Sequence, residues 1–212
     1  MGKPKKALVA VAHPDDEVLW SGGTILMHPE YDWSIYTLCR RTDPDREPRF
    51  RKSLDYLRAG GEMGNLNDEP EQIALPTLIV AEAIHTLVPA GHYDWVLTHS
   101  PRGEYTRHRR HEEVGRAVLN LWEKGILDAK EIWLFAYEDG QGAYLPRPIP
   151  DADIITPLPE SIWQAKFRLI TSIYGFALES YEARTTPRTE AFWRIGSASE
   201  VKLWLTEKEA QR

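Results

Sequence analysis

A short, unbroken apolar run near the N-terminus constrains the fold of this chain most. Residues 7–12 read Ala-Leu-Val-Ala-Val-Ala, and His13 and Pro14 then begin a polar turn. A strand that lacks polar alternation is typical of a parallel sheet whose two faces are both covered. Residues 18–27 carry apolar side chains around a pair of glycines and predict a helix, so the chain opens as strand, turn and helix.

The same alternation continues along the chain. Further strands are predicted at 34–39, 72–75, 95–98 and 131–136, and further helices at 50–63, 77–87, 111–123 and 161–173. Strands and helices that alternate in this way favour an open parallel sheet with right-handed crossovers and helices on both faces. We therefore predict a three-layer α/β fold of Rossmann-like type, mostly parallel, with the strand order 3-2-1-4-5.

A length of 212 residues suits one domain. We predict a core over about 7–136, followed by a loop or lid and closing elements over 137–212. The loop prediction rests on residues 137–159, which hold five prolines.

The composition excludes several classes of protein. Apolar residues make up 42% and charged residues 27% of the chain, as in folded globular proteins. The net charge of −6 argues against a general nucleic-acid binder, although the run Arg107 to His111 is basic enough to hold one small anionic group. The chain contains no run of about 18 apolar residues, so we predict no membrane insertion.

Two further features bear on the compartment. The single cysteine, Cys39, cannot form an internal disulfide, so nothing in the chain requires an oxidising environment. The basic start of the chain is followed by too short an apolar stretch for a signal peptide. We expect a cytoplasmic protein.

The turn after the first predicted strand concentrates groups that bind metals and move protons. It reads His13-Pro14-Asp15-Asp16-Glu17 and stands at the carboxyl end of the strand, where open α/β sheets bind ligands. His13 and Asp16 are three residues apart and can face one ion, while Asp15 points elsewhere and can take a proton from water. The other interpretation of this turn is a polar helix cap.

A third ligand is expected at the end of the fourth strand, since strands one and four border the crevice of such a sheet. The sequence there offers His99, then His108 and His111. A site with two histidines and one aspartate leaves coordination positions open, as catalytic zinc requires, so zinc is the metal that we expect. For His108 and His111 the alternative is an exposed basic loop that leads into a helix.

The pentapeptide His13 to Glu17, together with a downstream histidine pair ahead of a helix, resembles the PIG-L/LmbE-like zinc N-deacetylases over about residues 7–118. The resemblance implies that His13 and Asp16 bind zinc and that Asp15 is the general base. The family's second motif is usually His-Pro-Asp-His, and it implies that His111 binds zinc and that His108 acts on the reacting carbonyl. In this chain Arg109 and Arg110 replace the middle pair.

The resemblance also suggests substrate contacts. A family arginine on the helix after the second strand corresponds to Arg51 or Lys52, and we add Tyr105 and Arg110 as further candidates. Family members often form homo-oligomers, and the sequence leaves the oligomeric state open.

The function expected from these residues is hydrolysis of the N-acetyl group of an N-acetylglucosamine-type sugar conjugate. Zinc and Asp15 would activate water, and zinc and His108 would stabilise the oxyanion. Two alternatives stay open at this point: a zinc amidase or deacylase for a non-sugar amide, and a non-catalytic module that binds a sugar or phosphate.

Overall fold

The apolar strand at the start of the chain lies at the centre of the sheet. In the computed structural model, which describes residues 4–71, 73–105 and 108–206, strand β1 (Lys5–Val11) pairs in parallel with β2 (Tyr31–Cys39) on one side and β4 (His92–Thr98) on the other. The parallel strands β3 (Gly60–Leu66) and β5 (Asp128–Phe135) extend the sheet outward. Their order, β3-β2-β1-β4-β5, confirms the predicted 3-2-1-4-5 arrangement.

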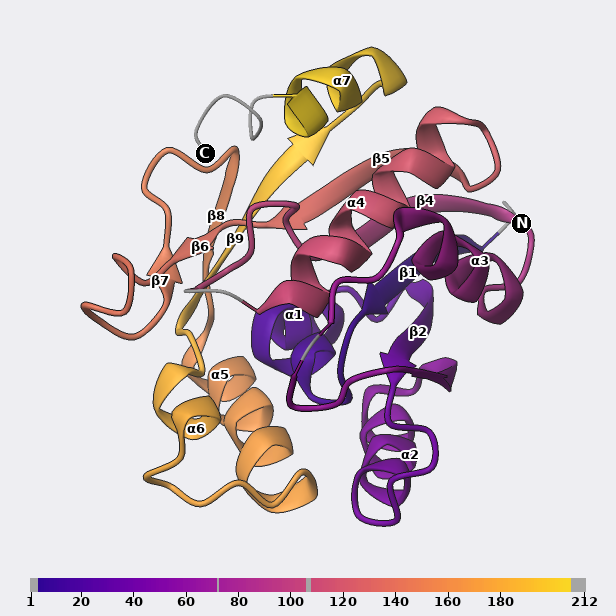
Figure 1. Cartoon of the computed structure of the whole chain (residues 1–212). Coiled ribbons are helices and arrows are strands. Elements are labelled where there is room, and N and C mark those ends of the chain that lie inside the picture. The colour runs from indigo at the N-terminus through magenta and orange to yellow at the C-terminus, as the bar shows by residue number, and fades with distance from the viewer. Residues whose placement is uncertain (1–3, 72, 106–107, 207–212) are drawn as a thin grey trace.

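Two antiparallel strands complete the sheet beyond β5. Strand β9 (Thr189–Ile195) pairs with β5, and β8 (Ile154–Pro157) pairs with β9 at the edge. The result is a seven-stranded, mostly parallel sheet (Figure 1). The predicted fold class is confirmed.

Helices cover both faces because the side chains of β1 alternate between two apolar clusters. Ala7, Val9 and Val11 join one cluster, and Leu8 and Ala10 join the other. The first cluster contains residues of α1 (Asp16–Met27), α2 (Arg46–Leu57) and the π-helical turn η1 (Leu169–Ile173). This turn continues α5 (Glu160–Arg168). The second cluster contains residues of α3 (Thr77–Leu87), α4 (Arg109–Glu123) and α7 (Ala198–Thr206). A short helix, α6 (Tyr181–Thr185), lies close to α5 (Figure 1). In the part of the chain that the structure describes, no helix is long and apolar enough to cross a membrane.

The third strand differs from the prediction. Helix α2 ends at Leu57, and Arg58 then adopts a left-handed conformation with φ of 54°, which ends the predicted 50–63 helix early. The next residues form β3, where Gly61 is required because a Cβ atom would lie 2.0 Å from the carbonyl oxygen of Ile35. Residues 73–75, predicted as this strand, form none, and Gln72 lies outside the described residues.

The proline-rich segment 137–159 also differs from a simple loop. Strands β6 (Tyr137–Glu138) and β7 (Arg147–Pro148) form a small antiparallel pair, and β8 then joins the main sheet. Two of the five prolines are compatible with this pairing, since Pro148 and Pro157 both lie on short strands at sheet edges.

A buried ion pair ties the closing elements to the first helix. The Nζ atom of Lys166 on α5 lies 2.6 Å from Oε1 of Glu190 on β9, and both side chains are fully buried. The Glu190 carboxylate also accepts hydrogen bonds from the backbone N–H groups of Gly23 and Thr24, each at 2.7 Å. The Thr24 hydroxyl is bonded to it as well, so four groups from α1 and α5 share one buried carboxylate of β9.

Replacing Lys166 with methionine is expected to lower the free energy of unfolding by about 3–5 kcal/mol, because the Glu190 carboxylate would lose its buried counter-charge. The measurement is urea denaturation. Lys130→Met, at an exposed position of β5, is the matched control and should change stability by less than about 0.5 kcal/mol. A similar small change in both variants would contradict this account of the pair.

Candidate functional site

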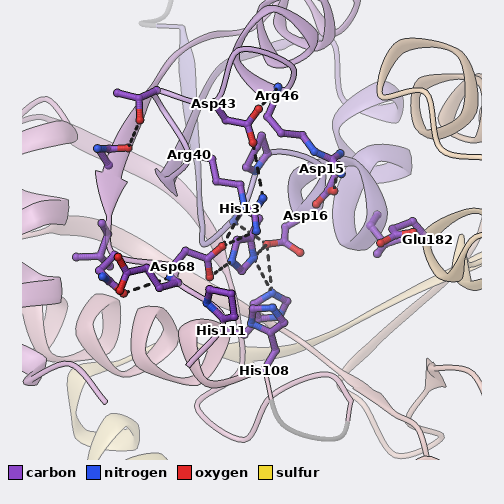
Figure 2. Close-up of a pocket in the computed structure, with 18 of the residues that line it drawn as sticks. His13, Asp15, Asp16, Arg40, Asp43, Arg46, Asp68, His108, His111 and Glu182 are labelled. Carbon is purple, nitrogen blue, oxygen red and sulfur yellow. Dashed lines mark hydrogen bonds and ion pairs between the residues drawn. The ribbon is translucent and has the colours of Figure 1, made fainter. Parts of the chain in front are cut away.

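Three side chains from two parts of the chain meet at the carboxyl edge of the sheet. His13 follows β1, Asp16 begins α1 and His111 lies in the first turn of α4. The Nδ1 atom of His13 lies 3.2 Å from Oδ2 of Asp16 and 3.3 Å from Nε2 of His111, and the last two atoms are also 3.3 Å apart (Figure 2). All three residues are less than 9% exposed.

This triangle has the dimensions of a metal site. Bonds of about 2.0–2.1 Å to a tetrahedral ion would hold nitrogen and oxygen ligands about 3.3–3.4 Å apart, which matches the three separations. Two imidazoles and one carboxylate suit zinc and several other divalent metals. The residues present therefore fit a divalent metal, with further coordination positions open toward solvent.

Other groups of potential ligands lie within 4.8 Å of one another and share members with this triangle. They are His13 with His108 and His111, Asp16 with His99 and His111, and His13 with Cys39 and Asp68. Nε2 of His99 already accepts a hydrogen bond from the backbone N–H of Ala12 at 3.0 Å. Burial raises the pKa of the Cys39 thiol, which disfavours the thiolate that a metal needs. These two observations disfavour the groups that contain His99 and Cys39. Of the rest we favour the triangle, because its three ligand atoms lie 3.2–3.3 Å from one another.

Two acidic residues orient the histidines of the triangle. Oε2 of Glu104 lies 2.8 Å from Nδ1 of His111, and Oδ1 of Asp68 lies 3.1 Å from Nε2 of His13. Each bond leaves the other ring nitrogen facing Asp16, as carboxylate partners do for metal-binding histidines. Burial alone would raise the pKa of Glu104, but His99 and His111 lower it to about 2.

Asp15 lies beside the triangle in a strained backbone conformation. Its φ is 129°, a region that side chains other than glycine rarely adopt. Its N–H donates to Oε2 of Glu17 at 2.9 Å, and its Oδ2 lies 3.4 Å from Nη1 of Arg46. Burial and the neighbouring Asp16 raise the pKa of the Asp15 carboxyl, and a higher pKa makes the ionised carboxylate a stronger base.

His108 precedes α4 and packs against the same cluster. Its ring centroid is 4.2 Å from that of His111 and 4.5 Å from that of His13. Burial lowers the pKa of His108, and His111 and His13 lower it further, to about 3, so the ring is neutral at pH 7. Among the described residues, its buried Nδ1 atom has no hydrogen-bond partner. A neutral imidazole can donate one hydrogen bond but is a poor source of a proton.

These groups open onto a cavity of about 960 Å³. The predicted residues that line it are His13, Asp15, Asp16, Tyr105, His108 and His111. The lining also includes Tyr181 and Glu182 from α6. The ring centroid of Tyr181 lies 5.4 Å from that of Tyr105, and Figure 2 shows Glu182 apart from the histidine cluster. No motif in the sequence pointed to this pair, because it comes from a short helix far along the chain.

Three predicted substrate contacts lie elsewhere. Arg51 bonds to Glu47 and Glu62, and Lys52 is exposed on α2 away from the cavity lining. Arg110 is fully buried and its guanidinium is bonded within the protein, so it does not reach the cavity. The α2 arginine that does line the cavity is Arg46, beside Asp15 (Figure 2).

Comparison with known proteins places the fold. No family model and no curated protein match the sequence. Solved structures do match. One is N,N'-diacetylchitobiose deacetylase from Pyrococcus horikoshii, with a TM-score of 0.61 and 18% identity, over 92% of this chain and 85% of that one. Another is the zinc-inhibited form of teicoplanin deacetylase Orf2, with a TM-score of 0.61 and 15% identity, over 91% of this chain and 99% of that one. At these identities the likeness establishes a shared fold, and it agrees with the resemblance to PIG-L/LmbE-like deacetylases.

A third match has another activity. GalB, the 4-carboxy-2-hydroxymuconate hydratase from Pseudomonas putida KT2440, has a TM-score of 0.57 and 17% identity, over 90% of this chain and 96% of that one. The same fold therefore carries deacetylases and a hydratase, and the choice between these activities depends on the site.

Proposed function

We propose that this protein is a zinc-dependent N-deacetylase that hydrolyses the N-acetyl group of an N-acetylated amino-sugar conjugate. The observation that carries the proposal is the triangle of His13, Asp16 and His111 beside Asp15, at the floor of a large open cavity. Deacetylases with the same fold, one of them named for a diacetylated sugar, support it.

The reaction adds water to the acetyl carbonyl carbon and breaks the C–N bond, which releases acetate and an amine. When bound, zinc would polarise the carbonyl and lower the pKa of the attacking water. Asp15 takes the proton from that water and returns it to the leaving nitrogen. His108, being neutral, donates a hydrogen bond to the oxygen as it gains charge.

The charges that line the cavity favour a neutral, hydroxylated substrate. Among the described residues the lining carries two guanidiniums and six carboxylates, namely Arg40, Arg46, Asp15, Asp16, Asp43, Asp68, Glu69 and Glu182. Arg40 is paired with Asp68 at 2.8 Å, and Arg46 lies 3.4 Å from Asp15. Even with a divalent metal bound, acidic groups outnumber the positive charges, which disfavours an anionic substrate.

This charge balance separates the proposal from a hydratase activity. The substrate named for GalB bears carboxylates, and a cavity rich in carboxylates would repel such a molecule.

The charge balance of the cavity lining also argues against our expectation that the basic run at 107–111 holds an anion. Arg110 of that run is buried, and Arg107 lies outside the described residues. Carboxylate oxygens accept hydrogen bonds from sugar hydroxyls, which fits a saccharide.

The test is acetate release from a panel of N-acetylglucosaminyl conjugates by the zinc-loaded protein. Neutral conjugates should be turned over, and each should have a higher kcat/KM than the same conjugate with a phosphate added. Release from non-sugar N-acetyl amides but from no sugar would favour the amidase reading. A folded, zinc-loaded protein that releases no acetate from any of them would contradict the proposed activity.

Three further proposals concern the whole chain. We propose one domain over residues 1–212, since β8 and β9 of the closing part join the sheet of the core. The charge of −6 supports a protein without a nucleic-acid partner. We also propose a cytoplasmic location. The oligomeric state, which the sequence leaves open, is tested by size measurement in solution.

A further inference from the structure

Arg110, which stands where the PIG-L/LmbE-like motif has an aspartate, is the centre of a buried clamp. Its side chain is fully buried, with Nε donating to the backbone oxygen of Asn67 at 2.6 Å and Nη2 to that of Ile73 at 2.9 Å. Glu113, one turn further along α4, accepts from Nη1 of Arg110 and from the backbone N–H of Leu75 at 2.9 Å. One turn of α4 therefore holds the segment between β3 and α3 at three backbone groups.

The clamped segment carries Asp68, next to the residue whose carbonyl Arg110 holds. The Asp68 side chain is 7% exposed, and its Oδ1 lies 3.1 Å from Nε2 of His13. Its Oδ2 accepts from Nε and Nη2 of Arg40 at 3.0 and 2.8 Å. Both carboxylate oxygens of Asp68 are thus engaged, and one of them fixes the ring of a proposed metal ligand.

The two ends of this arrangement belong to one metal site. Helix α4 supplies His111 directly, and through Arg110 it also holds the segment whose Asp68 orients His13. We propose that Arg110 and Asp68 are positioning residues that set the ring of His13 relative to His111. This proposal rests on the proposed metal site, and it gives the replacement of the family aspartate by arginine a physical role.

A purely structural clamp and a positioning clamp differ in what they change. A structural clamp would alter the free energy of unfolding and leave the folded site as it was. A positioning clamp alters the affinity of the folded site for the metal, because removing an outer partner of a metal-binding histidine typically costs about 10- to 100-fold in affinity. If Arg110 and Asp68 act through the same contacts, the effects of their substitutions on metal affinity should be non-additive. Once Asp68 no longer orients His13, the further loss of Arg110 should not lower the affinity again.

The experiment measures zinc affinity by competition with a chelator, and the absorption spectrum of the cobalt(II)-substituted protein, for Asp68→Asn, Arg110→Met and the double variant. Arg109→Met, at the exposed neighbouring position on α4, is the matched control. We expect zinc affinity to fall about 10- to 100-fold in Asp68→Asn and by a smaller factor in Arg110→Met, because Arg40 still holds Asp68. The double variant should lose no more zinc affinity than Asp68→Asn alone, and the cobalt spectrum of Asp68→Asn should differ from that of the unsubstituted protein.

Several results would overturn the proposal. They are unchanged zinc affinity and an unchanged cobalt spectrum in Asp68→Asn, or losses that add fully in the double variant. If Arg110→Met does not fold, Glu113→Gln tests the same clamp while keeping Arg110. This test can be told apart from the test of the proposed activity. A protein that binds zinc and releases no acetate would contradict the proposed deacetylase activity, and its zinc affinities would still test the roles of Arg110 and Asp68.

Discussion

Replacing Asp15 with asparagine is expected to reduce kcat for acetate release by about 10²- to 10⁴-fold while the protein still binds its metal, because the loss of a general base has this cost. Asp15 has no contact with the metal triangle that would make it a ligand, and its carboxylate lies against Arg46 instead. Asparagine has nearly the same size and branching as aspartate, so it should fit the backbone conformation that Asp15 adopts with φ of 129°. The substitution therefore removes the base and keeps the backbone.

The measurements are kcat and KM with the preferred conjugate, together with metal content. Asp43→Asn is the matched control, since Asp43 is another carboxylate of the cavity lining and its Oδ1 atom accepts from the backbone N–H groups of Asp45 and Arg46, which asparagine can also satisfy. It should change kcat by less than about tenfold, below the range for a general base. Full activity in Asp15→Asn would show that another group takes the proton.

The parts of the fold that the sequence predicts well are those in which local pattern and burial agree. Strand β1 is apolar on both faces and α3 matches its predicted bounds, Thr77–Leu87. Strand β3 was missed because it reads Gly-Gly-Glu-Met-Gly-Asn-Leu, with one fully buried apolar side chain, Met63. Its position depends on close approach to β2, which no local pattern reveals. The apolar residues at 73–75 led to the wrong prediction of a strand at 72–75. Their backbone groups are bonded to the side chains of Arg110 and Glu113 and not to a neighbouring strand.

The site divides in the same way. The pentapeptide containing His13 and Asp16 could be read directly, because its residues are adjacent and follow a recognisable strand. Glu104 and Asp68 could not, since neither belongs to a motif: Glu104 bonds to a histidine seven residues further along the chain, and the partner of Asp68 is 55 residues away. Arg110 was predicted to contact the substrate, whereas its side chain is buried and bonded to backbone groups within the protein.

Replacing His111 with alanine is expected to abolish both metal binding and turnover. Only His13 and Asp16 would remain of the triangle, and two protein ligands do not hold a catalytic zinc. The loss of zinc affinity should exceed the roughly 10- to 100-fold cost of losing an outer partner such as Asp68. Metal content after dialysis and zinc affinity by chelator competition measure the effect, with His85→Ala, at an exposed position on α3, as the control.

His111 also belongs to two of the other possible ligand groups, so its loss alone does not identify the triangle. His108→Ala and His99→Ala make that distinction, because each removes a member of one alternative group and leaves the triangle complete. If the triangle binds the metal, both variants keep about one zinc per chain, and His108→Ala loses rate through its missing hydrogen bond to the oxyanion. Zinc lost with His108 would make that ring a ligand, and its neutral, buried state would then serve coordination and not catalysis.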